Sequence, residues 1–289
     1  MQSTEDHTPR RILIVDDDPD IHQFLGIALR GYGFHLESAF NGQEGLNRIE
    51  SAGWDLVITD VIMPVMGGME LLERVRRLRP QLPVLVMTVD STAQKIVTAI
   101  RDHAFAWLQK PFTKEAVIEL VNVALAEPPP EGDIEVISAS PRWLELRLRC
   151  DMKTAWRALH FLREMDQGLP EDEREDVALA FREILFNAVE HGGGNDPNVF
   201  VTVTYTRADN ALLFRVRDPG PGFSFDNLRH AAAGNPDSPV EHATTRAALG
   251  MRPGGFGILL IRNLVDELIY NEKGNEALLI RYGPARQKD

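Results

Sequence analysis

Residues 12–18 read Ile-Leu-Ile-Val-Asp-Asp-Asp, and residues 56–60 read Leu-Val-Ile-Thr-Asp. Each run consists mainly of apolar or β-branched residues and ends in a carboxylate, a pattern typical of a strand buried on both faces. Further short runs occur at Phe34–Ser38, Val84–Met87 and Ala106–Leu108. Helix-like stretches lie between these runs, so the first half of the chain predicts a parallel sheet covered by helices on both faces.

The helix-like stretches of the first half have the apolar spacing of amphipathic helices. Examples are Ile21–Leu29, Glu70–Leu78 and Thr92–Ile100, and Thr113–Ala126 closes the unit as a fifth helix. The following run, Glu127-Pro-Pro-Pro-Glu-Gly-Asp133, cannot be helical and predicts a stiff linker. We therefore expect a first domain at residues 1–127, a linker at 128–140 and a second domain at 141–289.

The second half has a different order of elements. One strand is expected first, then two helices, then two strands, a long irregular stretch, a further helix and a hairpin. These are Trp143–Cys150, Lys153–Met165, Glu171–His191, Val199–Thr206, Leu212–Arg217, Phe223–Met251, Ile258–Val265, Glu267–Asn271 and Ala277–Tyr282. The order predicts an α+β domain with helices on one face of a mostly antiparallel sheet.

Composition narrows the function classes. A chain of 289 residues fits about two domains, and a net charge of −12 argues against a general nucleic-acid binder. No apolar run approaches the ~20 residues that span a bilayer, and the polar N-terminus lacks a signal peptide. Cys150 is the single cysteine, so no internal disulfide is expected and the default compartment is a reducing cytoplasm.

Polar side chains follow several strands of the first predicted sheet. Asp16, Asp17, Asp60, Thr88 and Lys110 each come at the end of a strand. Because the carboxyl ends of parallel strands meet at one edge, these residues should lie close together. A carboxylate cluster needs a cation, and oxygen ligands favour Mg²⁺. Lys110 can pair with the acceptor or with its phosphoryl group, and the Thr88 hydroxyl can hydrogen-bond a phosphoryl oxygen.

These stretches resemble a response-regulator receiver domain of the CheY-like type, which has a flavodoxin-like, doubly wound fold. The matching segments are residues 12–19, 55–64, 82–88 and 108–112. The resemblance implies that Asp60 is phosphorylated by a partner histidine kinase or phosphotransfer protein. It also implies Asp16, Asp17 and Asp60 as Mg²⁺ ligands, with Thr88 and Lys110 contacting the phosphoryl group.

One helix of the second half carries a second group of polar residues. Glu183 and Asn187 are four residues apart and share a helix face, and His191 extends the same side. An Asn oxygen is a suitable Mg²⁺ ligand, and Glu183 could orient or deprotonate a nucleophile. Taken alone, these residues also fit an ordinary solvated helix face.

Two glycine clusters follow this helix in the sequence. In Asp218-Pro-Gly220-Pro-Gly222, glycines let the backbone approach a ligand, and the Asp can accept a hydrogen bond from the amine of adenine. Gly254-Gly255-Phe256-Gly257 opens a predicted helix, where backbone N–H groups favour phosphate. Each cluster alone is a common turn, and their order after the Asn187 helix is the informative feature.

The second half resembles the GHKL ATPases, most closely the RsbW-like anti-sigma-factor serine kinases. The matching segments are residues 183–191, 218–222 and 255–267. The resemblance implies ATP and Mg²⁺, with Asn187 as metal ligand, Asp218 as adenine reader and Glu183 as general base. His191, Gly220, Gly222, Gly255 and Gly257 would complete the ATP site.

Together the two resemblances lead us to expect a cytoplasmic, bacterial two-component response regulator, phosphorylated on Asp60. Its output would be an RsbW-like serine/threonine kinase that phosphorylates or binds a STAS-type anti-sigma-factor antagonist. One alternative is a non-catalytic ATP-binding module that sequesters a sigma factor or antagonist. A second alternative is an atypical histidine-kinase-like module. We expect no direct nucleic-acid or membrane contact, and homodimerisation stays open.

Overall fold

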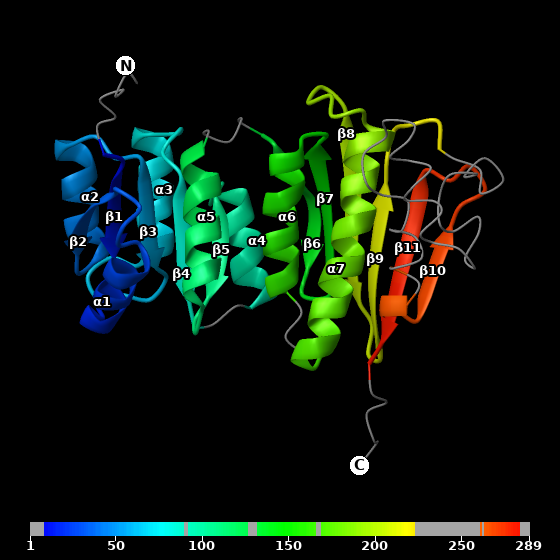
Figure 1. Ribbon diagram of the computed structural model, residues 1–289, viewed down its shortest axis with the longest axis horizontal. Coiled ribbons are helices and arrows are strands. Elements are labelled where there is room, and N and C mark those ends of the chain that lie inside the picture. Colours follow the sequence, from blue (N-terminus) through cyan, green and yellow to red (C-terminus); the bar gives the residue numbers. More distant parts are fainter. Residues whose placement is uncertain are drawn as a thin grey trace, which may run out of the picture. The chain divides into compact units, whose positions relative to one another are not determined.

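The computed structural model describes residues 9–89, 92–126, 132–165, 169–222, 261 and 263–283. The chain divides into two compact units, residues 1–131 and 132–289. Figure 1 labels their helices and strands, and each unit is described by itself.

The first unit contains a five-stranded, fully parallel sheet in the order β2-β1-β3-β4-β5. The strands are β1 (Arg11–Val15), β2 (His35–Ala39), β3 (Leu56–Asp60), β4 (Val84–Thr88) and β5 (Ala106–Gln109). Asp60 is the last residue of the central strand, β3. The predicted parallel sheet is confirmed, with strand ends within about one residue of those expected from the sequence.

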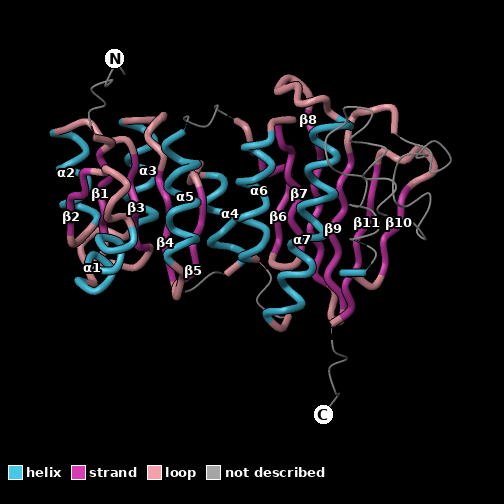
Figure 2. Tube along the Cα trace, in the orientation of Figure 1, coloured by secondary structure: helices cyan, strands magenta, loops and turns pink. Residues whose placement is uncertain are grey.

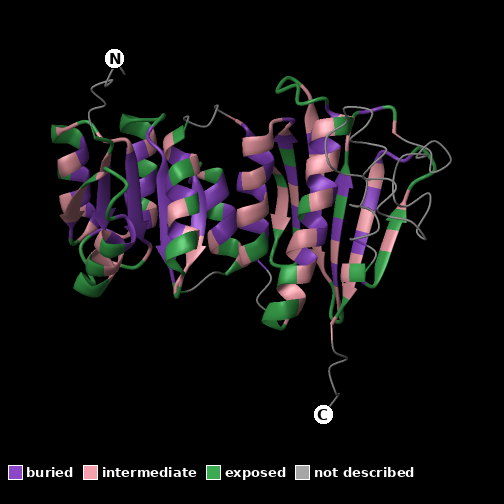
Figure 3. Ribbon diagram, in the orientation of Figure 1, coloured by how far each residue is buried: buried purple, intermediate pink, exposed green. Residues whose placement is uncertain are grey.

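Five helices alternate with these strands. They are α1 (Pro19–Ala28), α2 (Gly42–Ser51), α3 (Gly68–Leu78), α4 (Ala93–Arg101) and α5 (Lys114–Ala126). Helix α1 packs against α5 and α2 packs against α3, as right-handed crossovers on the two faces of a sheet require. Strands β1, β3 and β4 are almost completely buried (Figure 3), which explains their continuous apolar runs, whereas the edge strand β2 is mostly only partly buried.

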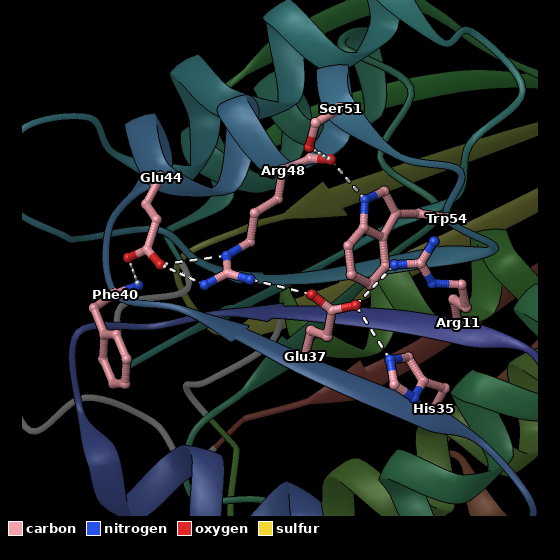
Figure 4. Close-up of polar contacts among 8 residues, drawn as sticks. All are labelled: Arg11, His35, Glu37, Phe40, Glu44, Arg48, Ser51 and Trp54. Carbon is pink, nitrogen blue, oxygen red and sulfur yellow. Dashed lines mark hydrogen bonds and ion pairs between the residues drawn. The ribbon is translucent and has the colours of Figure 1, made fainter.

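Charged side chains tie the edge strand β2 to its neighbours (Figure 4). Glu37 of β2 pairs with Arg11 of β1 at 2.7 Å and with Arg48 of α2 at 3.1 Å. Arg48 also pairs with Glu44 at 2.9 Å, and the Arg11 guanidinium lies 4.4 Å from the centroid of the Trp54 ring. The hydrogen bond from Arg11 holds the pKa of Glu37 below its usual range. These ion pairs hold β2 against β1 and α2.

The second unit contains a six-stranded antiparallel sheet in the order β10-β11-β9-β8-β7-β6 (Figure 2). The strands are β6 (Ile134–Ser140), β7 (Trp143–Arg149), β8 (Phe200–Arg207), β9 (Ala211–Arg217), β10 (Glu267–Tyr270) and β11 (Glu276–Tyr282). The α+β prediction for this half is confirmed.

Helices α6 (Met152–Glu164) and α7 (Glu171–Asn187) of the second unit pack against each other and on strands β7, β9 and β11. A π-helical turn, η1 (Ala188–Gly192), extends α7. On α7, Val177, Phe181, Ile184 and Leu185 are buried. Phe181 contacts Phe214 of β9, with ring centroids 4.5 Å apart.

The structure differs from the sequence reading at two places in this unit. Residues 134–140, which we placed in the linker, form β6 and pair with β7. Glu171–His191 was expected to be one α-helix, but its last turn is a π-helix. The predicted irregular stretch at 223–251 and most of the predicted helix at 258–265 lie outside the described residues.

A buried ion pair joins the start of the second unit to its first helix. Asp133, directly before β6, contacts Arg157 of α6, and both residues are less than 5% exposed. The Asp133 carboxylate also accepts from the hydroxyl of Thr154 at 3.4 Å, and its carbonyl accepts from Arg149 N–H at 2.9 Å. Asp133, the last residue of the Pro-rich run that begins at Glu127, is therefore fixed inside the second unit.

Candidate functional site

Three charged side chains meet at the carboxyl edge of the first sheet. The Lys110 ammonium, after β5, lies 2.7 Å from Oδ2 of Asp16 and 2.9 Å from Oδ1 of Asp60. Asp16 is fully buried and Asp60 is 8% exposed. The sequence prediction that these residues converge is confirmed by these distances, although they lie up to 94 positions apart.

Local backbone contacts hold the two carboxylates in place. The second oxygen of Asp16 accepts from Asp18 N–H at 2.9 Å, and that of Asp60 accepts from Ile62 N–H at 3.1 Å. Gly68, at the start of α3, lies against the Asp60 backbone, and a Cβ there would come within 1.9 Å of the Asp60 carbonyl oxygen. The start of α3 can therefore approach β3 this closely only with glycine at position 68.

The pKa values follow from burial and charge. Burial raises the pKa of Asp60, and the bond from Lys110 lowers it by less. For Lys110, burial lowers the pKa, but the bonds to Asp16 and Asp60 outweigh it and the net pKa is raised. The lysine is therefore charged at neutral pH and neutralises part of the charge of the two acids.

The other two predicted acceptor-site residues lie at the same edge. Thr88 ends β4 and is 1% exposed, and its carbonyl accepts from Lys110 N–H at 2.7 Å. Asp17 is exposed in the loop between β1 and α1. Across the part of the chain that the structure describes, no three His, Cys, Asp or Glu side chains form a metal-binding group. Carboxylate oxygens from Asp16 and Asp60 nonetheless have the chemistry that Mg²⁺ prefers, so the magnesium site stays a prediction.

The sequence reading missed His22, which lies in α1 beside the acidic loop. Its Nε2 is 2.8 Å from the Asp16 carbonyl oxygen, and its ring lies 4.8 Å from that of Phe40. It thus packs the β1–α1 loop against the loop after β2. A histidine within a helix pattern gives no signal of such a contact.

In the second unit, the end of the α7–η1 helix packs on the loop that follows β9. A Cβ at position 192 would lie 2.2 Å from Cγ of Asp218, and one at position 220 would lie 2.7 Å from the Gly192 carbonyl oxygen. Helix end and loop can therefore approach this closely only with glycine at both positions. Oδ1 of Asp218 accepts from Gly220 N–H at 2.8 Å.

The residues predicted to form the ATP-binding face of this helix differ in how far they are buried. Glu183 and Asn187 are partly buried, and Asn187 is the last residue of α7. His191 is exposed in η1. The structure brings together Asp218, Gly220 and the end of the helix. Gly255 and Gly257, of the other glycine cluster, lie outside the described residues.

Burial raises the pKa of Asp218, and the Gly220 N–H and the Lys273 charge lower it by less. Cys150, after β7, packs on the same helix end, where a Cβ at Gly193 would lie 2.2 Å from its sulfur. Burial raises the pKa of this thiol to about 11. Cys150 is therefore a packing residue of the helix end.

Comparison with known proteins finds one family match in each of the two compact units. Residues 12–122 match the model of the response regulator receiver domain, and residues 147–281 match the model of the histidine kinase-like ATPase domain. The chain therefore carries an N-terminal receiver domain and a C-terminal histidine kinase-like ATPase domain. In the part that the structure describes, no helix is long and apolar enough to cross a membrane.

Individual relatives resemble the receiver half alone. The transcriptional regulatory protein GlrR of Escherichia coli (strain K12) is 33% identical over 144 residues, which are 48% of this chain and 32% of GlrR. The DNA-binding transcriptional regulator NtrC of Rhizobium meliloti (strain 1021) is 37% identical over 121 residues, 42% of this chain and 25% of NtrC. The chain thus spans about a third or less of the length of these relatives.

Among solved structures, a CheY-like response regulator receiver domain protein from Methanospirillum hungatei JF-1 is 32% identical. The match covers 41% of this chain and 94% of that chain, with a TM-score of 0.40. A response regulator from Chloroflexus aurantiacus J-10-fl is 33% identical, with coverage of 42% and 100% and a TM-score of 0.40.

Proposed function

We propose that this chain is a two-component response regulator that accepts a phosphoryl group on Asp60 and thereby controls an ATP-dependent, RsbW-like output. A histidine kinase or phosphotransfer protein is the donor. The output phosphorylates, on Ser or Thr, a STAS-type anti-sigma-factor antagonist. ATP and Mg²⁺ are the cofactors of the output, and Mg²⁺ also serves the receiver.

The observation that carries the receiver half of the proposal is the contact of Lys110 with both Asp16 and Asp60. During transfer, an oxygen of Asp60 bonds to phosphorus while the bond from phosphorus to the donor nitrogen breaks. The Lys110 ammonium would stabilise the negative charge on the phosphoryl oxygens. Mg²⁺, held by Asp16, Asp17 and Asp60, would neutralise the remaining charge.

The output half is supported by the packing of the α7–η1 helix end on the Asp218 loop. Gly192 and Gly220 bring the helix that bears Glu183 and Asn187 next to the carboxylate proposed to read adenine. Asn187 would hold Mg²⁺, and Glu183 would take the proton of a partner hydroxyl as its oxygen bonds to the γ-phosphorus and ADP leaves.

The serine-kinase branch is favoured over a histidine kinase by the segment before α7. Residues 132–165 form two strands and one helix, whereas a histidine kinase presents a two-helix hairpin with its donor histidine. This segment supports a kinase that acts on another protein's hydroxyl group.

The first experiment tests the receiver. Acetyl phosphate with Mg²⁺ should add one acid-stable, base-labile phosphoryl group to the wild type and none to Asp60→Asn. Asp55→Asn is the matched control, because Asp55 lies at the other end of the strand and contacts Arg10 at 2.7 Å. Equal labelling of wild type and Asp60→Asn would refute the assignment.

The second experiment tests the output. The protein is incubated with labelled ATP and each STAS protein of the same genome. Glu183→Ala should keep ATP and partner binding and lose transfer by about 10²–10⁴-fold, while Glu175→Ala, an exposed residue of the same helix, should behave as wild type. Tight STAS binding without any transfer by the wild type would instead support the sequestering alternative.

A further inference from the structure

The turn between β10 and β11, residues 271–275, makes a series of contacts with the loop at Asp218. We propose that this turn positions the Asp218 carboxylate, so that Asn275 and Lys273 determine how well the site distinguishes adenine from other bases. The inference rests on the proposed function, because it presumes that Asp218 reads the exocyclic amine of ATP.

Asn275 holds the backbone of Asp218 from two directions. Its carbonyl accepts from Asp218 N–H at 3.0 Å, and its side-chain amide donates to the Asp218 carbonyl oxygen, also at 3.0 Å. Asn275 is 7% exposed. The bonds of a buried amide are costly to remove, because the partner loses its hydrogen bond without gaining water.

Asn271 fixes the orientation of the Asn275 amide. Nδ2 of Asn271 donates to Oδ1 of Asn275 at 3.0 Å, which leaves Nδ2 of Asn275 as the group that faces Asp218. Oδ1 of Asn271 accepts from the N–H groups of Gly274 and Asn275 at 2.8 and 3.1 Å. The turn is therefore stiffened by its own side chains before it contacts the loop.

Two further contacts hold the rest of the loop. The Lys273 ammonium donates to the Gly220 carbonyl oxygen at 2.9 Å. Gly222 has φ of +78°, and a Cβ there would lie 1.9 Å from the Lys273 carbonyl oxygen. The turn thus contacts Asp218, Gly220 and Gly222, every second residue of the loop.

Among the described residues, these contacts leave one Asp218 oxygen for a ligand. Oδ1 is used by Gly220 N–H within the loop, and one side of the carboxyl group is closed by Gly192. No hydrogen bond of Oδ2 is found among the described residues, so Oδ2 is the oxygen that would accept from the adenine amine. Its direction depends on the Asp218 backbone, which Asn275 holds.

The test compares two nucleotides on the full chain. Calorimetry gives the affinity for ATP and for inosine triphosphate, which has an oxygen where adenine has its amine. Wild type should prefer ATP by about 10-fold or more, the size expected for a hydrogen bond to a charged group. Asp218→Ala should abolish this preference.

Asn275→Ala should reduce the ATP preference by about 5- to 10-fold, with little change in affinity for inosine triphosphate. Lys273→Met, which keeps chain length but loses the donor, should reduce it less. Asn210→Ala is the matched control, because Asn210 precedes β9 at the end opposite Asp218 and is exposed. A double variant of Asp218 and Asn275 should lose no more preference than Asp218→Ala alone.

The outcomes separate the two claims. If the wild type does not bind ATP, or Asp218→Ala keeps the preference, the proposed nucleotide site is wrong and this inference falls with it. If Asp218→Ala abolishes the preference but folded Asn275→Ala and Lys273→Met both retain it, the positioning role alone is overturned. Circular dichroism establishes folding, and Lys273→Met decides the question if Asn275→Ala does not fold.

Discussion

Removing the cation and removing the acceptor carboxylate should have very different effects on the stability of the receiver. Lys110→Met leaves the carboxylates of Asp16 and Asp60 buried without the ammonium that lies 2.7 and 2.9 Å away. Removing one partner of a buried ion pair costs about 3–5 kcal/mol. Asp60→Asn keeps the shape and an oxygen that can accept from Lys110, so it should cost about 1 kcal/mol or less.

The assay should report on the receiver alone, because two units need not unfold together. Amide hydrogen exchange of β3 and β4, read by mass spectrometry, gives the free energy of opening of that unit. Lys114→Met, at an exposed residue that begins α5, is the control and should change stability by less than about 0.5 kcal/mol. If Lys110→Met loses no more than Asp60→Asn, the argument from buried charge is refuted.

The carboxyl group of Asp60 should also make the stability of the receiver depend on pH. The folded-state pKa of Asp60 is raised above 3.8, so the unfolded chain releases this proton first as pH rises. Stability is therefore lost as pH rises from about 3.8 through the raised value. Asp60→Asn should remove that part of the pH dependence, and an unchanged profile would contradict the predicted shift.

Three further outcomes can be checked separately. Gly68→Ala should destabilise the receiver by about 1–3 kcal/mol and reduce acetyl phosphate labelling of Asp60, because its Cβ would meet the Asp60 carbonyl; Gly53→Ala, with no atom near its Cβ, should do neither. Asn187→Ala should weaken ATP binding in the presence of Mg²⁺ but not in its absence, as measured by calorimetry, and an equal loss in both would exclude a metal-ligand role. Cys150, with a pKa of about 11, should react slowly with iodoacetamide at pH 8 and faster as pH approaches 11, and fast labelling of the native chain at pH 8 would show that the thiol is not buried.

The sequence was sufficient to predict the receiver fold because its strands β1, β3 and β4 are buried on both faces. Their continuous apolar runs mark them individually, and the topology of a parallel sheet then brings Asp16, Asp60 and Lys110 to one edge. Pairing of Lys110 with the acceptor Asp60 was expected, but its additional contact with Asp16 could not be predicted, since it depends on side-chain directions. Asp17 is exposed in this structure, which strand-end position alone does not indicate.

The second unit was harder to read for physical reasons. Strand β6 lies at the edge of its sheet, most of its residues are only partly buried, and its register shifts between Val136 and Ser138, so no clear alternation marks it. The π-helical turn changes the spacing of side chains after Asn187, which a count based on an α-helix misses. The contacts of Asn275 with Asp218 join residues 57 positions apart and leave no periodic signal.

The burial of Asp133 against Arg157 has a practical consequence for anyone who wishes to transplant the ATPase domain onto another sensor. A fragment cut at residue 137 or 141, as the linker composition would suggest, would lose part or all of β6 and the carboxylate that Arg157 contacts. Such a fragment would expose the edge of β7 and be prone to aggregation. Fusions made before Gly132 preserve β6 and the contact between Asp133 and Arg157.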